Sequence, residues 1–292
     1  MGTYLNPGNG GFERITQSNY VDKTGMISII NERINTIDSL ICISRPRRFG
    51  KSYAAQMLCA YYDHTCDSHS LFEGKAVSVS EQYEKHLNKY NVIYLDIAGF
   101  VSDVKRRDGN IKAVVNEIAE AIRLDLISEY PELENLTKLS KCMLEYVETA
   151  KIKFVFIIDE WDAVIREAKN DFATQEAFLN LLREWFKNGN FTSKAVAAAY
   201  MTGILPIKKD GSESAISDFR EFTILQPGSF VQYTGFTESE VKQLCKQHGM
   251  SFEETKEWYD GYDFKRCEPI YNPYSVMMAM QMGEFKSYWR KT

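Results

Sequence analysis

The clearest chemistry in this sequence is phosphate binding by Gly50-Lys51-Ser52. These residues stand between an apolar run at 40–43 and a helix-like stretch that begins at Tyr53. A strand, a short loop ending in Gly-Lys-Ser and a helix form the usual layout of a nucleoside triphosphate site. Successive backbone N–H groups and the positive end of the helix would surround the phosphate oxygens. Lys51 would place its charge on the β- and γ-phosphates, and the Ser52 hydroxyl would coordinate Mg²⁺.

The first half of this loop departs from the usual pattern. That pattern opens with Gly, whereas this loop has Arg45 there, followed by Pro46. Pro46 has no N–H and removes one amide donor from the phosphate cradle, so arginine side chains must compensate. The residues predicted to bind the nucleotide are Arg45, Arg47, Arg48, Phe49, Gly50, Lys51, Ser52, Tyr53 and, from a later strand, Thr202.

The second chemical feature is the acidic pair Asp159-Glu160, which follows a continuous apolar run at 154–158. Such a run predicts a central parallel strand that is buried on both faces. Ligands of α/β sheets lie outside the carboxyl ends of the strands, so we expect the pair to face the Gly-Lys-Ser loop. Asp159 would hold Mg²⁺ through its water shell, and Glu160 would orient and deprotonate the attacking water. The alternative is that both acids only cap a helix beginning at Trp161.

Polar residues near these two features could complete the site. Thr202 follows a predicted strand at 194–201, where it could touch the γ-phosphate or the attacking water, or equally bond within its own turn before Gly203. Arginines can also neutralise transition-state charge. The candidates are Arg166, Arg183 and Arg220, although a solvated surface position is the better interpretation of each. On this interpretation the catalytic residues are Glu160 and Lys51, and the metal ligands are Ser52 and Asp159.

Two further polar clusters offer weaker chemistry. The segment 64–69, with Cys59 nearby, contains zinc-ligand residue types, but its spacing matches no standard zinc site and it ends a predicted helix. The run Lys105-Arg106-Arg107 could contact nucleic acid. A solvated charge run beside Asp103 and Asp108 is the simpler interpretation.

The composition is that of an ordinary globular protein. The chain has 292 residues, of which 44% are hydrophobic and 26% charged, with a net charge of −5. The negative balance argues against coating nucleic acid through overall charge. The start lacks a basic and apolar leader, and no run approaches the roughly 20 apolar residues of a membrane span. The six cysteines form no CxxC pair. We therefore expect a cytoplasmic protein with reduced cysteines and no membrane segment.

Apolar periodicity predicts an α/β fold with a mainly parallel central sheet, because strands alternate with helices. The predicted strands are 39–44, 91–96, 154–158 and 194–201, and the predicted helices are 26–34, 51–63, 78–88, 111–129, 134–149 and 172–187. Residues 1–19 and 102–110 are predicted to be irregular, and Ser78 with Glu81 to cap a helix. Capping boxes at 237–240 and 251–254 open short helices. We expect residues 1–236 to form a core and 237–292 a small, mostly helical subdomain.

Six sequence blocks together resemble the AAA-ATPase-like family of bacterial proteins, over nearly the whole chain from about residue 10. The blocks are residues 20–24, 45–52, 159–160, 235–241, 258–262 and 271–275. The resemblance implies a P-loop ATPase of the additional-strand class with a helical lid, which binds ATP and Mg²⁺. It carries over Lys51 and Ser52 as phosphate and Mg²⁺ ligands and Asp159-Glu160 as the acidic pair. The resemblance also makes Arg45 a family variant. The expectation of ATP rather than GTP rests on the resemblance alone.

Family members often continue into a domain resembling PD-(D/E)XK nucleases, which would begin after Trp289. No predicted strand here carries the acidic residues and lysine of such a nuclease, since Glu254-Thr255-Lys256 falls in a predicted helix. Nuclease activity is therefore not expected of this polypeptide. The leading hypothesis is an ATP-hydrolysing switch or motor for an unknown protein partner or for a nuclease-like domain supplied elsewhere. A nucleotide-binding regulatory module with little or no hydrolysis, and a nucleic-acid-dependent ATPase, are the alternatives.

Overall fold

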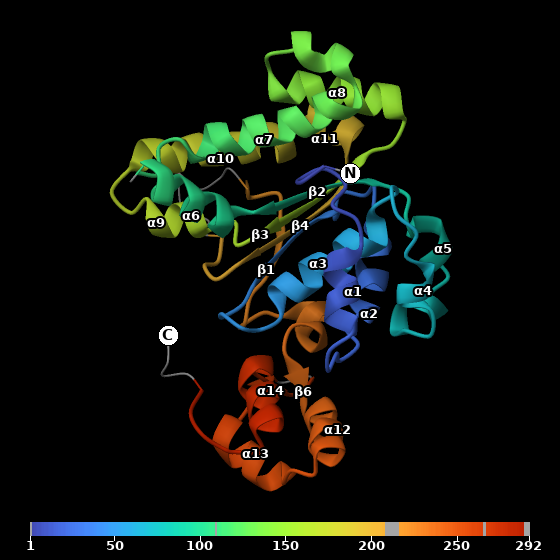
Figure 1. Cartoon of the computed structure of the whole chain (residues 1–292), viewed down its shortest axis with the longest axis vertical. Coiled ribbons are helices and arrows are strands. Elements are labelled where there is room, and N and C mark those ends of the chain that lie inside the picture. Colours follow the sequence, from blue (N-terminus) through green and yellow to red (C-terminus); the bar gives the residue numbers. More distant parts are fainter. Residues whose placement is uncertain (1, 109, 208–215, 265–266, 289–292) are drawn as a thin grey trace. The chain divides into compact units, whose positions relative to one another are not determined.

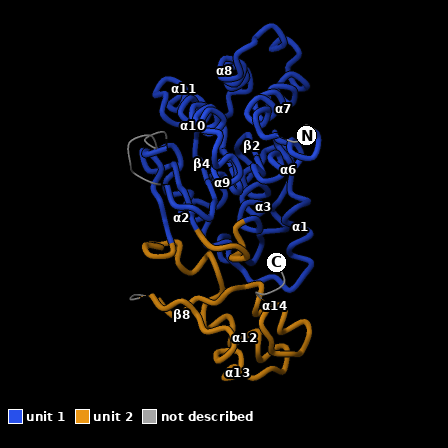
Figure 2. The backbone as a smooth tube through the Cα atoms, turned by 90° about the vertical axis from the view of Figure 1, so that its left-hand side faces the viewer, with its two compact units in different colours: residues 1–44, 52–223 blue, residues 45–51, 224–292 orange. Residues whose placement is uncertain are grey.

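The computed structural model describes residues 2–108, 110–207, 216–264 and 267–288. The chain divides into two compact units (Figure 2). Unit 1 comprises residues 1–44 and 52–223, and unit 2 comprises residues 45–51 and 224–292. Most of the predicted phosphate loop therefore groups with the C-terminal residues. The division that we expect between residues 236 and 237 stays a prediction.

Unit 1 is built on a five-stranded parallel sheet of order β2-β3-β4-β1-β5 (Figure 1). The strands are β1 (Leu40–Ser44), β2 (Asn91–Asp96), β3 (Phe154–Asp159), β4 (Val196–Gly203) and β5 (Arg220–Phe222). Every residue of β1, β3 and β4 is buried, which explains why their sequences are continuous apolar runs. The predicted α/β fold is confirmed. Strand β4 lies between β1 and β3, as the additional-strand class requires.

Helices cover both faces of this sheet (Figure 1). One layer contains α1 (Gly10–Thr16), α2 (Gly25–Asn31) and α3 (Lys51–Tyr62), extended by α4 (His69–Phe72), η1 (Ala76–Val79) and α5 (Tyr83–His86). The other contains α6 (Ile97–Asp108), α7 (Val114–Glu129), α8 (Leu139–Ala150), α9 (Ala163–Glu167), α10 (Phe172–Phe186) and α11 (Gly189–Ala195), with η2 (Pro131–Asn135) between α7 and α8. No helix among the described residues is long and apolar enough to cross a membrane.

The hydrophobic core lies between the sheet and the layer α6–α11. The ring of Phe156 in β3 packs against Trp185 and Phe186 of α10, with ring centres 5.4 and 5.1 Å apart. Complete burial of each such side chain contributes about 1.5–3 kcal/mol. Cys42 of β1 belongs to the same core, and burial raises the pKa of its thiol. Four of the six cysteines, Cys42, Cys59, Cys142 and Cys245, are buried.

Unit 2 combines short helices with a small antiparallel sheet of order β6-β8-β7. Its elements are η4 (Gly228–Tyr233), β6 (Phe236–Thr237), α12 (Glu238–His248), α13 (Phe252–Tyr259), β7 (Tyr262–Phe264), β8 (Cys267–Tyr271) and α14 (Pro273–Met282). The capping box predicted at Thr237 and Glu240 is present, and Ser251 caps α13 by accepting the N–H of Glu254 at 3.2 Å. This small sheet is not predicted from the sequence, because such short strands carry little periodic signal.

Two local predictions are wrong on the segment 78–108. The charged stretch from residue 102 is predicted as a loop, but it forms the second half of α6. It is helical because Val104 is buried, while Lys105 and Arg107 pair with carboxylates of other helices. Residue 109 lies outside the described residues. The helix predicted at 78–88 is replaced by η1 and α5, and the Ser78 hydroxyl donates to the Lys75 carbonyl instead of capping. The predicted irregular segment 1–19 also contains a short helix, α1.

His86 in α5 is buried as a neutral imidazole and should make stability depend on pH. Its Nδ1 lies 2.7 Å from the Tyr90 hydroxyl, and burial lowers its pKa from 6.5 to about 4. The unfolded chain binds a proton here below about pH 6.5, whereas the folded protein does so only near pH 4. The contribution of neutral, buried His86 to the free energy of unfolding is therefore complete above pH 6.5. It is lost as the pH falls toward 4.

We expect His86→Gln to flatten the fall in melting temperature between about pH 6.5 and 4, measured by thermal unfolding. His248→Gln, at a partly exposed position in α12, is the matched control and should keep the wild-type slope. Equal slopes for the His86 variant and the wild-type protein would contradict this account.

Candidate functional site

Residues 45–51 connect the last residue of β1 to the start of α3 and contain two left-handed residues. Arg48 has φ 70° and Gly50 has φ 79°. Glycine adopts this conformation freely, whereas it costs an L-residue such as Arg48 about 1–2 kcal/mol. Gly50 is therefore required by the backbone, and other contacts must hold Arg48 in place.

Those contacts come from C-terminal residues of unit 2. The Arg48 guanidinium lies 4.0 Å from the centre of the Tyr274 ring, and its Nη1 donates to the Tyr288 carbonyl at 3.3 Å. Arg45 Nε donates to the Thr234 hydroxyl at 3.0 Å, and both of these residues are buried. Arg45 and Arg48 thus connect the first half of the loop to residues between 234 and 288 of unit 2. Their predicted role as phosphate ligands stays a prediction.

Phe49 is also packed inside unit 2. Its buried ring meets Tyr262 edge to face, with ring centres 5.7 Å apart. Gly235, with φ 106°, leaves room for it: a Cβ there would lie 3.2 Å from the Phe49 ring and 2.3 Å from the Ile270 side chain. The predicted loop residue Phe49 therefore has a clear packing role.

Lys51, the predicted phosphate ligand, forms hydrogen bonds to the backbone of its own loop. Its ammonium donates to the carbonyls of Arg45 and Pro46 at 3.0 and 2.9 Å, and the residue is only 6% exposed. The carbonyl of the residue that replaces the usual Gly thus holds the lysine. The loop keeps its lysine in place through its own backbone.

The remaining predicted loop residues are accessible. Arg47, Ser52 and Tyr53 are exposed, Tyr53 to 60%. Among the described residues Arg47 makes no hydrogen bond or ion pair, so it differs from Arg45 and Arg48. A ligand could reach all three side chains.

Asp159 ends β3 as a buried carboxylate. The Thr202 hydroxyl donates to Asp159 Oδ1, and the backbone N–H of Glu160 donates to the same oxygen at 3.1 Å. The register that pairs Ile158 with Met201 places Thr202 beside Asp159 at the carboxyl ends of β3 and β4. This contact between the two polar residues is one that sequence analysis does not predict.

Glu160 follows in a left-handed turn with φ 50°. Such a conformation costs a non-glycine residue about 1–3 kcal/mol and occurs mainly where surrounding contacts enforce it, often at functional sites. The Glu160 N–H also lies 3.3 Å from the Thr202 hydroxyl, and the next N–H, of Trp161, donates to the Thr202 carbonyl at 2.9 Å. Helix α9 begins only at Ala163, so Asp159 and Glu160 do not cap a helix that starts at Trp161.

Within the part of the chain that the structure describes, the cationic partner of the Glu160 carboxylate is Arg166. Arg166 Nη2 lies 2.7 Å from Glu160 Oε2, and Arg166 Nε lies 3.0 Å from Asp162 Oδ2. From the sequence, Arg166 is only a candidate arginine finger, and neither contact is predicted. The i,i+4 spacing of Asp162 and Arg166 is the signal that predicts the second.

A family model described as "Predicted AAA-ATPase" matches residues 8–212, which include the loop, the acidic pair and Thr202. The chain belongs to the AAA-ATPase-like family. Membership implies P-loop nucleotide binding. A protein of Azotobacter chroococcum mcd 1 named "Uncharacterized protein in vnfD 5'region" is 22% identical over 277 residues, which cover 94% of this chain and 50% of the relative. The chain thus spans about half the length of that relative.

Other candidate residues of this AAA-ATPase-like protein have structural partners. Arg183 pairs with Glu176 along α10, and Arg220 pairs with Asp38. Lys105, Arg106 and Arg107 lie on α6 and each pairs with a carboxylate, from Glu167, Asp103 and Glu117 respectively. These cations are already engaged with acidic side chains.

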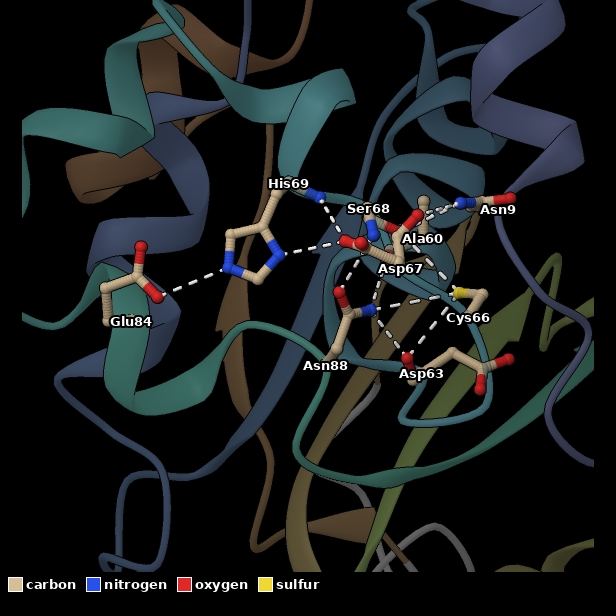
Figure 3. Close-up of polar contacts among 9 residues, drawn as sticks. All are labelled: Asn9, Ala60, Asp63, Cys66, Asp67, Ser68, His69, Glu84 and Asn88. Atoms are coloured by element: carbon tan, nitrogen blue, oxygen red, sulfur yellow. Dashed lines mark hydrogen bonds and ion pairs between the residues drawn. The ribbon is translucent and has the colours of Figure 1, made fainter.

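Within the segment 64–69, residues 66–69 form a polar network with Asp63, Glu84 and Asn88 (Figure 3). His69 lies between Asp67 and Glu84, at 2.9 and 3.3 Å, and its hydrogen bond to Asp67 raises its pKa. Asn88 donates to the Asp63 carbonyl at 2.6 Å. No group of three or more His, Cys, Asp or Glu that could hold a metal ion occurs among the described residues.

The bond between Thr202 and Asp159 can be tested by stability. Thr202→Val removes the hydroxyl donor at nearly constant volume and should destabilise the fold by about 1.5–3 kcal/mol in urea unfolding, since the bond is to a charged group. In an Asp159→Asn background the same change should cost less, because a neutral amide is less expensive to leave unpaired. Equal costs in both backgrounds would show that the hydroxyl does not act through Asp159.

Proposed function

We propose that this protein binds ATP with Mg²⁺ and hydrolyses it. The observation that carries the proposal is the arrangement at the end of β3, where the carboxylate of Asp159 is buried and bonded by Thr202 while the strained Glu160 is partly exposed. A buried acid followed by an accessible one suits two tasks, holding hydrated Mg²⁺ and orienting water. Structural strain at Glu160 adds weight to a functional role.

The residues suit the group that they would hold. Ser52 offers an exposed hydroxyl, and Asp159 Oδ2 has no hydrogen-bond partner among the described residues. Hard oxygen ligands of this kind are those that Mg²⁺ prefers, often through water. Bound Mg²⁺ would neutralise phosphate charge. Lys51 would bind the β- and γ-phosphates, and Glu160 would orient and deprotonate the attacking water.

A second candidate function is nucleotide binding with little or no hydrolysis. It is favoured by the loop itself, because Pro46 lacks an N–H and the side chains of Arg45 and Arg48 are engaged with residues of unit 2. Compensation for the missing donor then falls mainly to the exposed Arg47. Phosphate release distinguishes the two functions.

The cellular role extends the same proposal. We place the protein in the cytoplasm, which agrees with the burial of four of its six cysteines as thiols. We assign it a switch or motor role for a protein partner or a nuclease-like domain supplied elsewhere. Residues 237–292 would act as the lid. The nucleic-acid-dependent alternative has less support, because the cations at 105–107 are paired on α6.

Two substitutions should separate binding from hydrolysis. Lys51→Ala should weaken ATP affinity by about tenfold or more, because it removes a charged phosphate ligand. Glu160→Gln should preserve affinity and lower turnover by about 10²–10⁴-fold, the range for loss of a general base. Calorimetry and phosphate release, each with ATP and with GTP, measure the two effects.

The matched controls are exposed residues of the same types. Lys194→Ala on α11 and Glu145→Gln on α8 should leave both quantities unchanged. Unchanged affinity in Lys51→Ala would overturn the phosphate role. If wild-type turnover does not exceed that of Glu160→Gln while ATP still binds, the binding module is the correct function.

A further inference from the structure

Glu160, Arg166 and Asp162 form a chain of ion pairs within unit 1. Arg166 bridges the two acids, with Nη2 2.7 Å from Glu160 Oε2 and Nε 3.0 Å from Asp162 Oδ2. From this geometry we infer that Arg166 is a positioning residue for hydrolysis, which fixes the carboxylate of Glu160 so that its other oxygen receives the attacking water. The inference rests on the proposed function and assigns it a further residue.

The two oxygens of Glu160 have different surroundings. Oε2 accepts from Arg166, whereas Oε1 has no hydrogen-bond partner among the described residues. The Glu160 side chain is 29% exposed, so water can approach it. A glutamate held by one oxygen keeps a defined rotamer and offers the second oxygen to a ligand. A water-orienting carboxylate needs this combination, because small displacements of a positioned group reduce rates strongly.

Arg166 is itself fixed from behind. Asp162 is completely buried, and its Oδ2 also accepts the backbone N–H groups of Ile204 and Leu205, at 3.3 and 3.0 Å. These N–H groups follow directly after β4. The position of the guanidinium is therefore set by backbone beyond the end of β4 and not by a flexible surface partner. Glu160 is thereby tied to the end of β4 as well as to β3.

Arg166 also borders open space that makes a chemical test feasible. It lines a cavity of about 1020 Å³ together with Ile165, Glu167, Asp171 and Leu205. The side chain is 16% exposed. Free guanidinium can therefore reach the place that the side chain vacates in a shortened variant.

The test is the steady-state ATPase activity of Arg166→Ala in the full chain. We expect kcat to fall on the order of 10- to 100-fold while KM and the ATP affinity stay as in the wild-type protein, because only the orientation of Glu160 is lost. Guanidinium at a non-denaturing concentration should restore part of kcat. Arg166→Lys should be intermediate, since an ammonium keeps the charge but lacks the fork that bridges two carboxylates.

A nucleotide-free readout accompanies these kinetics. Arg166→Ala and Glu160→Gln should be non-additive in the urea midpoint of unfolding, since each removes the same ion pair. In the Glu160→Gln background, Arg166→Ala should cause no further loss of turnover. Arg123→Ala is the matched control, because that arginine is 18% exposed in its side chain and pairs with Glu120 on α7.

The outcomes are distinct. A kcat for Arg166→Ala that is unchanged, or raised because the ion pair restrains Glu160, would overturn the inference and leave the proposed hydrolysis intact. A parallel loss of ATP affinity would make Arg166 a nucleotide contact and also overturn it. If the wild-type protein releases no phosphate, the proposed hydrolysis itself fails and the positioning role of Arg166 fails with it.

Discussion

One buried charge, the carboxylate of Asp159, determines how the carboxyl edge of the sheet is built. A carboxylate that is taken out of water is costly unless donors surround it. The described residues supply the Thr202 hydroxyl and the N–H of Glu160 as donors. Directly after this bond Glu160 adopts φ 50°, so the chain turns away from the strand direction. The bonds that satisfy Asp159 thus also place Glu160 at the accessible edge.

The phosphate loop obtains its shape in a different way. Loops of this kind usually rely on glycine where the backbone bends. Here Gly50 supplies one of the two left-handed residues, and side-chain contacts hold Arg48 at the other. Arg48 is held in a strained conformation by Tyr274 and by the Tyr288 carbonyl, and Arg45 by Thr234. These partners lie beyond the family match, which ends at residue 212. In this chain, therefore, the conformation of the loop depends on residues outside the matched region.

Sequence predicts the features that local pattern encodes and misses those that depend on pairing between distant segments. The buried strands β1 to β4 follow from apolar runs, and the loop and acidic pair from residue type and order. The bond between Thr202 and Asp159 requires the register of β3 and β4, which residue patterns do not specify. The partner of Arg48 is 240 residues away in the chain. Helix α6 is missed although its pattern is local. Its second half is mostly charged and is therefore predicted as a loop, but it also contains the buried Val104.

The two halves of the proposed chemistry are stabilised by separate sets of contacts. The acidic edge is held within unit 1, by Thr202 on Asp159 and by Asp162 on Arg166. The loop is held within unit 2 by aromatic and hydroxyl partners of its arginines. The two sets share no residue, and stability effects of sites without shared partners are nearly additive. The proposed binding and the proposed hydrolysis thus depend on separate sets of contacts, so that substitutions can test them one at a time.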